Sequence, residues 1–503
     1  MSYLAAVDAG ASAIKVSIFD SVGNEIVGVH RDCPVESSKP GWAECPSDFL
    51  MQWPLELLEE ALQSSGIQGD AIRAVAITGS TGTMLPVGAD GMSTGPVILW
   101  YDSRARSAVT ELTSRLSPDR FAQLTGVPLD HASVVAKILW FRAADPDAFA
   151  STALFAHPQT AVLHALTGSG WFCDDSHGPY FGLMDLEARH WSDELLAATQ
   201  LHPELLPQLI APGTVVGTPS SAVARKTGLN PQTPVVAAGA DASCFTLGTG
   251  VEKAGVASAY IGTAGVMGVI TDRPVRHPSL TCMPSVLPGH WDVQGLLLTG
   301  GSAYRWLRTL LSDSTGNTKP VSFEDLNTMA AGVPPGSEGV TIVPHLAGAG
   351  TPLWNPEACG MIVGLRLSHG PEHLARAMLE GIAFAQRHAL ETLKEVVSPI
   401  RHLRFSGGGS ASELWSQIMA DVTGLPVSVP ASSESTALGA AIVAGVATGL
   451  FGDFSTAVAA MSKTANQWEP SPAPNACYET GYQSYLQALS QMGMAESGTV
   501  EYE

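Results

Sequence analysis

Two aspartates that follow predicted strands are the residues of this 503-residue sequence best placed to do chemistry. Asp241 comes after a short apolar strand predicted at 235–238 and before a helix predicted to start at 242. A carboxylate there lies at the carboxyl end of a buried strand, where open α/β sheets bind ligands, and a helix start favours a transferring phosphoryl group. The same position also suits an aspartate that caps the helix, and the pattern leaves both uses open.

Asp8 ends the first predicted strand and begins a turn of small residues. A carboxylate in that position suits Mg²⁺, which prefers one or two carboxylates together with water and phosphate oxygens. Gly10 would let phosphate oxygens approach backbone N–H groups, Ser12 offers a hydroxyl, and Lys15 would supply positive charge if it points the same way. An ordinary hairpin turn accounts for the same residues, so this role stays a hypothesis.

Two further glycine turns could bind a nucleotide. Gly262 and Thr263 form a turn between two predicted strands, as the residues after Asp8 do. The three glycines of Gly407–Gly409 follow the strand-like run 403–405. Three glycines between a strand and a helix let a flat ligand lie on the backbone, whereas a plain turn needs only one. A purely structural turn remains the alternative at both places.

Other polar candidates are expected to be structural. Asp102 is expected to form an internal ion pair with Arg104. His369 and His373 are four residues apart, but the Gly-Pro pair between them breaks any helix that would align both on a metal. We therefore expect these histidines to be surface or core residues.

Several classes of protein are excluded. The sequence has no Gly-x-x-x-x-Gly-Lys-Ser/Thr, Gly-x-Gly-x-x-Gly, His-Glu-x-x-His or Gly-x-Ser-x-Gly motif. A net charge of −21 makes a poor surface for nucleic acid or anionic lipid, so neither is expected as a partner. The most apolar stretch, 437–451, is shorter than the ~20 residues of a membrane span and is expected to be a closely packed helix. The N-terminus lacks the basic segment of a signal peptide, so a cytoplasmic location is expected.

The elements that must position these residues follow from the apolar pattern. Strands are predicted at 3–7, 14–19, 25–30, 74–77, 235–238, 257–261 and 266–270, and a helix that Pro54 kinks is predicted at 46–64. The strand–glycine turn–strand layout of residues 3–19 recurs at 257–270. This recurrence predicts a duplicated domain with a boundary near residues 245–255.

Taken together, these segments resemble the FGGY carbohydrate kinases, in the superfamily of sugar kinases, actin and chaperone ATPases, from residue 3 to about 450. The matching segments are Asp8–Gly10, Trp100–Arg104, Gly239–Asp241, Gly262-Thr263, Pro344–Leu346, Thr351-Pro352 and Leu379–Gly381. The most specific part runs from Gly407 to Val427 and continues through Glu434 to Ala437–Ala441. Few other families have this order and spacing.

The resemblance implies an α/β fold of two ribonuclease H-like (actin-like ATPase) domains with an active-site cleft between them. The sugar would lie mainly on residues 1–247 and ATP mainly on residues 248–503. Asp241 matches the catalytic base of the family, and Asp8 matches its Mg²⁺-linked aspartate. The ATP site would include Gly10, Ser12, Lys15, Gly262, Thr263, Gly408, Gly409 and Ser412. The sugar site would include Ser80, Thr81, Gly82, Thr83, Asp102 and Asp241.

The xylulose kinase branch is the most similar, with two departures. Xylulose kinases carry Ser-Gly-Gln-Met-His-Gly where this chain has Thr78–Thr83, so small residues replace the Met-His pair. The familiar Gly-Glu-Arg-Thr-Pro becomes Gly348–Pro352, without the charged pair. The expected activity is phosphorylation of a pentulose such as D-xylulose. Another pentulose, a polyol such as erythritol, a sugar acid such as gluconate and, last, glycerol are the alternatives.

An alternative from another class is a non-catalytic nucleotide-binding chaperone or regulator of the same superfamily. Such a chaperone would need a peptide-binding domain, and a sugar-sensing repressor would need a helix-turn-helix. The sequence has room for neither. The oligomeric state is left open, and a homodimer is compatible with the sequence.

Overall fold

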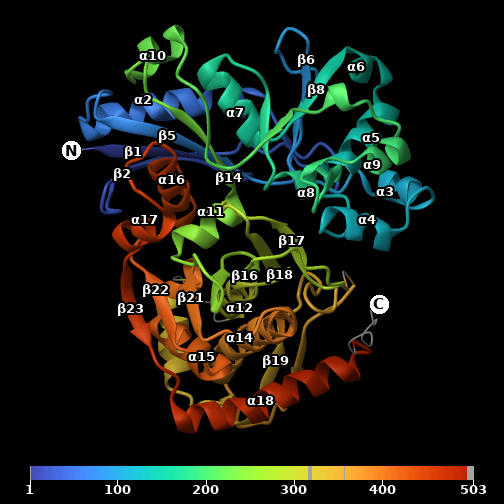
Figure 1. The fold of residues 1–503 in the computed structure, drawn as a ribbon. Helices are drawn as coiled ribbons and strands as arrows, with labels where there is room; N and C mark the ends of the chain where they lie inside the picture. The colour runs from blue at the N-terminus through green and yellow to red at the C-terminus, as the bar shows by residue number, and fades with distance from the viewer. Residues whose placement is uncertain (1, 315–319, 356, 495–503) are drawn as a thin grey trace. The chain divides into compact units, whose positions relative to one another are not determined.

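The computed structural model describes residues 2–314, 320–355 and 357–494, and the chain forms two compact units (Figure 1). Unit 1 comprises Met1–Glu252, Thr271–Asp292 and Glu434–Lys463. Unit 2 comprises Lys253–Ile270, Val293–Ser433 and Thr464–Glu503. The units therefore interleave along the sequence, because two segments of the second half belong to unit 1.

A six-stranded sheet in the order β13-β14-β5-β1-β2-β3 forms the centre of unit 1. Its strands are β1 (Tyr3–Ala9), β2 (Ala13–Asp20), β3 (Glu25–Asp32), β5 (Ile72–Gly79), β13 (Thr214–Gly217) and β14 (Val235–Ala240). β1 pairs antiparallel with β2 and parallel with β5, which pairs parallel with β14. These three parallel strands are almost continuously apolar and buried, as strands covered by helices are. Their carboxyl ends meet at one edge, so the residues that follow them lie together.

Unit 1 contains thirteen α-helices within its described residues. They are α1 (Asp48–Met51), α2 (Trp53–Ser65), α3 (Arg106–Thr113), α4 (Pro118–Thr125), α5 (Val134–Ala144), α6 (Pro146–Ser151), α7 (Pro158–Thr167), α8 (Gly178–Phe181), α9 (Asp193–Thr199), α10 (Ser221–Thr227), α11 (Asp241–Gly248), α16 (Ser435–Ala447) and α17 (Phe454–Met461). The helix predicted at 46–64 is divided into α1 and α2, because Pro54 lacks the N–H that would continue the first helix. α2 packs on β2 and β3, α7 on β5 and β14, and α16 on β1, β5 and β14.

α16 is the closely packed helix predicted from the apolar stretch, and it crosses α11 at two glycines. A Cβ added at Gly439 of α16 would lie 1.8 Å from the carbonyl oxygen of Cys244 in α11. A Cβ at Gly248 of α11 would lie 1.8 Å from the carbonyl oxygen of Ser435. Only glycine permits the two backbones to approach this closely.

In unit 2, six strands of the second large sheet follow the order β18-β16-β15-β21-β22-β23. These are β15 (Val256–Ile261), β16 (Gly265–Thr271), β18 (Trp291–Leu297), β21 (His402–Ser406), β22 (Val427–Pro430) and β23 (Thr464–Trp468). The helices are α12 (Gly301–Ser314), α13 (Phe323–Ala331), α14 (Pro371–Val396), α15 (Glu413–Thr423), α18 (Pro472–Gln491) and the short η3 (Gly408–Ala411). α14 packs against α12, α13 and α15.

The two sheets repeat one pairing pattern. β15 pairs antiparallel with β16 and parallel with β21, which pairs parallel with β22, as β1 does with β2, β5 and β14. An antiparallel strand follows in both sheets, β13 in one and β23 in the other. The duplication predicted from the two glycine-turned hairpins is therefore confirmed as a duplicated topology.

The remaining elements are short. They are β4 (Glu44–Cys45), β6 (Leu85–Gly88), β7 (Val97–Ile98), β8 (Thr152–Ala156), β9 (Phe172–Asp174), β10 (Met184–Asp185), β11 (His190–Trp191), β12 (Gln208–Ile210), β17 (Thr281–Pro284), β19 (Thr341–Val343), β20 (Met361–Val363), η1 (Pro203–Leu205) and η2 (Ser337–Gly339). None of the helices in the described part of the chain combines the length and the apolar character needed to span a membrane.

Candidate active site

Asp241 is the first residue of α11 and directly follows β14. The cap position is occupied by Ala240, and no side chain caps the helix, so the capping alternative is wrong. Oδ1 of Asp241 instead accepts a hydrogen bond from the N–H of Ala242 at 2.8 Å. Burial raises the pKa of Asp241, although the N–H of Ala242 and the charge of His177 act in the opposite direction. A half-buried carboxylate with a raised pKa is suited to accept a proton from a hydroxyl.

Asp8 is half-buried at the end of β1, which is next to β5 in the sheet. Burial and then the charge of Asp241 raise the pKa of Asp8 to about 7, while Lys15 acts in the opposite direction. The two aspartates therefore lie close enough at this edge of the sheet to influence each other. Oδ1 of Asp8 is buried and has no hydrogen-bond partner within the described residues. A buried carboxylate oxygen of this kind fits a divalent cation.

Lys15 lies opposite Asp8 in the β1–β2 hairpin and forms an ion pair. Its Nζ is 3.1 Å from Oε2 of Glu434, the residue before α16. Ser12 is exposed in the turn, and a Cβ at Gly10 would lie 3.1 Å from the carbonyl oxygen of Ala13. The turn is therefore tight, and the phosphate roles of these residues stay predictions.

The loop from Ser80 to Thr83 follows β5 and so starts at the same edge as Asp8 and Asp241. Ser80 and Thr83 are buried, and their hydroxyl oxygens lie 3.3 Å apart, while Thr81 is half-buried. Gly82 has a φ of +74°, and a Cβ there would lie 2.7 Å from the carbonyl oxygen of Ala132. Four of the six predicted sugar contacts thus lie in one packed loop, and their contact with a sugar stays a prediction.

Asp102 is fully buried and forms the predicted ion pair with Arg104. Its Oδ2 accepts the N–H of Ala43 and lies 2.7 Å from Nη2 of Arg104. The guanidinium also lies 2.7 Å from Oε2 of Glu44 and covers the ring of Trp42 at 3.7 Å from the ring centre. These contacts occupy the carboxylate of Asp102, and its sugar-binding role stays a prediction.

Arg104→Met should lower the free energy of unfolding by about 3–5 kcal/mol, because it leaves the carboxylate of Asp102 buried without its partner. Urea unfolding followed by circular dichroism measures the loss. Arg115→Met is the control, because the pair of Arg115 with Glu111 lies on the surface and contributes only about 0.5 kcal/mol. Equal, small losses in both variants would contradict a stabilising role for the buried pair.

In unit 2, the turn of Gly262 and Thr263 joins β15 to β16 and contacts the start of α12. The N–H of Gly301 donates to the carbonyl of Gly262 at 2.7 Å, and that of Gly300 donates to the carbonyl of Thr263 at 3.0 Å. A Cβ at Gly301 would lie 2.6 Å from the carbonyl oxygen of Gly262. Gly300 and Gly301 were not predicted as part of this site. The pattern that could have indicated them is the doubled glycine at the start of a helix.

The predicted adenosine residues lie between β21 and α15. A Cβ at Gly408 would meet no atom within 4 Å, whereas Gly409 packs against β15 and Gly407 has a φ of +87°. Ser412 is the N-cap of α15, and its hydroxyl accepts the N–H of Trp415 at 3.3 Å. Packing and conformation therefore account for Gly407 and Gly409, and Gly408 is the exposed backbone on which a flat ligand could lie.

The expectation that the Gly-Pro pair keeps His369 and His373 apart is wrong. Their ring centres lie 4.9 Å apart because the proline starts α14 instead of interrupting it, and Glu338 completes a group whose ligand atoms lie within 4.8 Å of one another. Nδ1 of each ring accepts a backbone N–H at 3.0 Å, from Arg366 and Gly370 respectively. A neutral ring with this partner carries its proton on Nε2, so the two rings are poor metal ligands in this arrangement.

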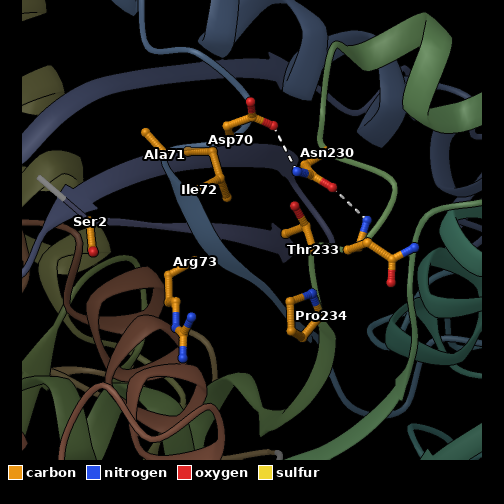
Figure 2. A pocket seen from close by; sticks show the side chains of 9 residues that line it. Ser2, Asp70, Ala71, Ile72, Arg73, Asn230, Thr233 and Pro234 are labelled. Atoms are coloured by element: carbon orange, nitrogen blue, oxygen red, sulfur yellow. Dashed lines mark hydrogen bonds between the residues drawn. The ribbon is translucent and has the colours of Figure 1, made fainter.

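A cavity of about 230 Å³ lies elsewhere on unit 1 (Figure 2). It is lined by Arg73 near the start of β5, Pro234 just before β14, and Asn230, whose amide donates to Oδ1 of Asp70 at 2.7 Å. It therefore lies at the amino ends of parallel strands, whereas Asp8 and Asp241 follow their carboxyl ends. Open α/β sheets bind ligands at the carboxyl ends, so this cavity is not the candidate active site.

A buried polar segment that was not predicted from the sequence lies beside Asp241. It consists of Asp174, the last residue of β9, and of Ser176 and His177, which lie between β9 and α8. The N–H of Ala240 donates to the hydroxyl of Ser176 at 2.8 Å. The available signal was a run of polar residues, Asp-Asp-Ser-His, between apolar segments.

The chain is similar to known proteins over most of its length. Residues 3–248 match the N-terminal domain of the FGGY family of carbohydrate kinases, and residues 257–448 match its C-terminal domain. The chain is 29% identical to glycerol kinase of Aromatoleum aromaticum, with 90% of this chain and 91% of that protein covered. It is 26% identical to gluconokinase of Bacillus subtilis, with 90% and 89% covered.

A solved structure, the xylulose kinase from Rhodospirillum rubrum, is similar with a TM-score of 0.88 and 26% identity, over 98% of this chain and 99% of that one. The mixed α/β architecture with two sheet-containing units is that of the actin-like ATPase fold. Since the two family domains together match most of the sequence, this chain belongs to the FGGY family of carbohydrate kinases.

Proposed function

We propose that this chain transfers the terminal phosphoryl group of ATP to a hydroxyl of a pentulose such as D-xylulose, with Asp241 as the general base. The observation that carries the proposal is the half-buried carboxylate of Asp241 at the carboxyl end of β14, with a raised pKa and Asp8 at the same edge. Phosphoryl transfer depends mainly on positioning, charge stabilisation and a carboxylate that receives the hydroxyl proton.

Asp241 would accept the proton of the attacking hydroxyl, which frees that oxygen to bond to phosphorus as the bond to ADP breaks. Asp8, with its buried oxygen, would hold Mg²⁺, which when bound neutralises the charge on phosphate oxygens. Phosphate would contact the turns at Gly10–Ser12 and Gly262-Thr263, and adenosine would contact Gly408. The sugar would thus lie mainly on residues 1–247 and the nucleotide mainly on residues 248–503.

Two observations bear on the choice of sugar. Ser80, Thr81 and Thr83 supply hydroxyls but less bulk than the Met-His pair of xylulose kinases. The relatives named above are a glycerol kinase, a gluconokinase and a xylulose kinase, so their names span polyol, sugar acid and pentulose. We rank a pentulose first, then a four- to six-carbon polyol or sugar acid, and glycerol last.

A coupled assay of ADP release across ketopentoses, tetritols, pentitols, aldonates and glycerol tests the proposal. We expect the highest kcat/KM with a ketopentose, because sites that hydrogen-bond particular hydroxyls discriminate strongly against analogues that lack them. Activity on glycerol or an aldonate without activity on any pentulose would contradict the ranking. Binding of ATP without ADP release across the panel would contradict the kinase reaction and favour a nucleotide-binding regulator.

A further inference from the structure

His177 lies in a fully buried position with an acceptor at each ring nitrogen. Nδ1 lies 3.1 Å from Oδ2 of Asp174, and Nε2 lies 3.2 Å from the carbonyl oxygen of Gly79. A carbonyl oxygen can only accept, so Nε2 must carry a proton. The state of Nδ1 then depends on whether Asp174 is ionised.

The contacts of Asp174 favour its carboxylate form. Its Oδ1 accepts the N–H of Ser176 at 3.0 Å and also the hydroxyl of Ser176. These bonds, together with the charge of His177, lower the pKa of Asp174 although burial acts in the opposite direction. With an ionised Asp174 beside Nδ1, both ring nitrogens donate, and His177 is a buried imidazolium.

The same segment is fastened to both strand ends that precede the candidate site. His177 bonds to Gly79, the residue before Ser80, and Ser176 bonds to Ala240, the residue before Asp241. The two strand ends are also joined directly, because the hydroxyl of Thr78 donates to the carbonyl of Gly239 at 2.7 Å. A shift of the segment would therefore move Asp241 as well as the Ser80 loop.

We propose that Asp174, Ser176 and His177 form a positioning unit for Asp241, in which the imidazolium of His177 stabilises the carboxylate of Asp241 in its basic form. The inference rests on the proposed role of Asp241 as the base. His177 acts through its positive charge and Ser176 through its bond to the N–H of Ala240. Neither residue touches the reacting atoms.

Other ionisable groups around His177 are compatible with this assignment. The ring of His157 lies 5.3 Å away, and burial followed by the charge of His177 holds its pKa well below the usual range, so His157 is neutral. Asp174 and Asp241 both favour the charged form of His177, and its pKa is raised although burial opposes it. The charge of Lys137 also lowers the pKa of His157. On Asp8, the charge of Lys15 lowers the pKa and that of Glu434 raises it. Burial, and to a smaller extent the charge of Asp241, raises the pKa of Tyr180.

The kinetic test is the pH profile of the variant His177→Gln. Glutamine can donate a hydrogen bond but carries no charge. Loss of a nearby positive charge raises the pKa of a carboxylate, so the acid limb of kcat/KM should move upward by about one pH unit. His164→Gln is the control, because that half-buried ring bonds to the carbonyl of Ser169 and stacks on Trp171 outside the unit. Its acid limb should not move. An equal loss of rate at all pH values in folded His177→Gln would overturn the proposal.

The direct test reads the protonation of the ring and needs no activity. In the ¹⁵N-histidine-labelled full chain at pH 7.5, both nitrogens of His177 should appear protonated, with assignment from the resonance that disappears in His177→Gln. If that variant does not fold, Asp174→Asn provides the assignment, because it changes the partner of Nδ1. A wild-type ring with one unprotonated nitrogen would overturn the charge assignment whether or not Asp241 proves to be the base.

Discussion

Asp241→Asn should lower kcat by about 10²- to 10⁴-fold with the best substrate, while the KM for ATP changes little. The amide cannot accept the proton of the attacking hydroxyl, and the backbone contact of residue 241 with Ala242 can be kept by the amide oxygen. Steady-state ADP release at saturating sugar and ATP measures the loss.

Asp145→Asn is the matched control for this substitution. Asp145 caps α6, where its Oδ1 accepts the N–H of Ala148 at 3.0 Å. Asparagine caps helices about as well as aspartate, so turnover and melting temperature should stay unchanged. Near-normal turnover in folded Asp241→Asn would remove Asp241 from the mechanism.

Gly439→Ala should lower the free energy of unfolding by about 3 kcal/mol or more. The added Cβ would lie 1.8 Å from the carbonyl oxygen of Cys244, so α16 and α11 would have to separate. Backbone cannot rotate away from such a contact as a side chain can. Since α11 begins with Asp241, we also expect lower activity in any folded fraction.

Thermal unfolding measures this effect, and Gly452→Ala is the control. A Cβ at Gly452 would meet nothing within 4 Å, so its melting temperature should stay equal or rise slightly. A melting temperature of Gly439→Ala within two degrees of the wild type would show that the helices tolerate separation.

Local patterns predicted the strands and the positions of their chemistry well. The apolar runs at 3–7, 74–77 and 235–238 each became a strand of the central sheet, extended by a few residues. This works because a strand buried by helices must be apolar along its whole length, and its end is marked where polar or small residues begin. Asp8 and Asp241 could therefore be placed at the sheet edge from sequence alone.

Contacts between distant segments could not be predicted in this way. No local pattern predicts that Lys15 pairs with Glu434, 419 positions later. The polar run around His177 was a local signal, but its two bonding partners, Asp174 and a carbonyl at the end of another strand, could not be predicted from it. The distance between His369 and His373 depends on whether the proline between them interrupts a helix or starts one. The same sequence is compatible with both roles of the proline.

The late position of α16 in the sequence has a consequence for biosynthesis. β1, β5 and β14 leave the ribosome long before Glu434–Lys463, the segment that contributes α16 to their covering. At roughly 5–20 residues per second, the 419 positions between Lys15 and its partner correspond to about 20–80 s of translation. During that interval the apolar surface meant for α16 is exposed in the nascent chain, so folding in the cell should depend on chaperones that protect it. A fragment ending at residue 247 should aggregate for the same reason.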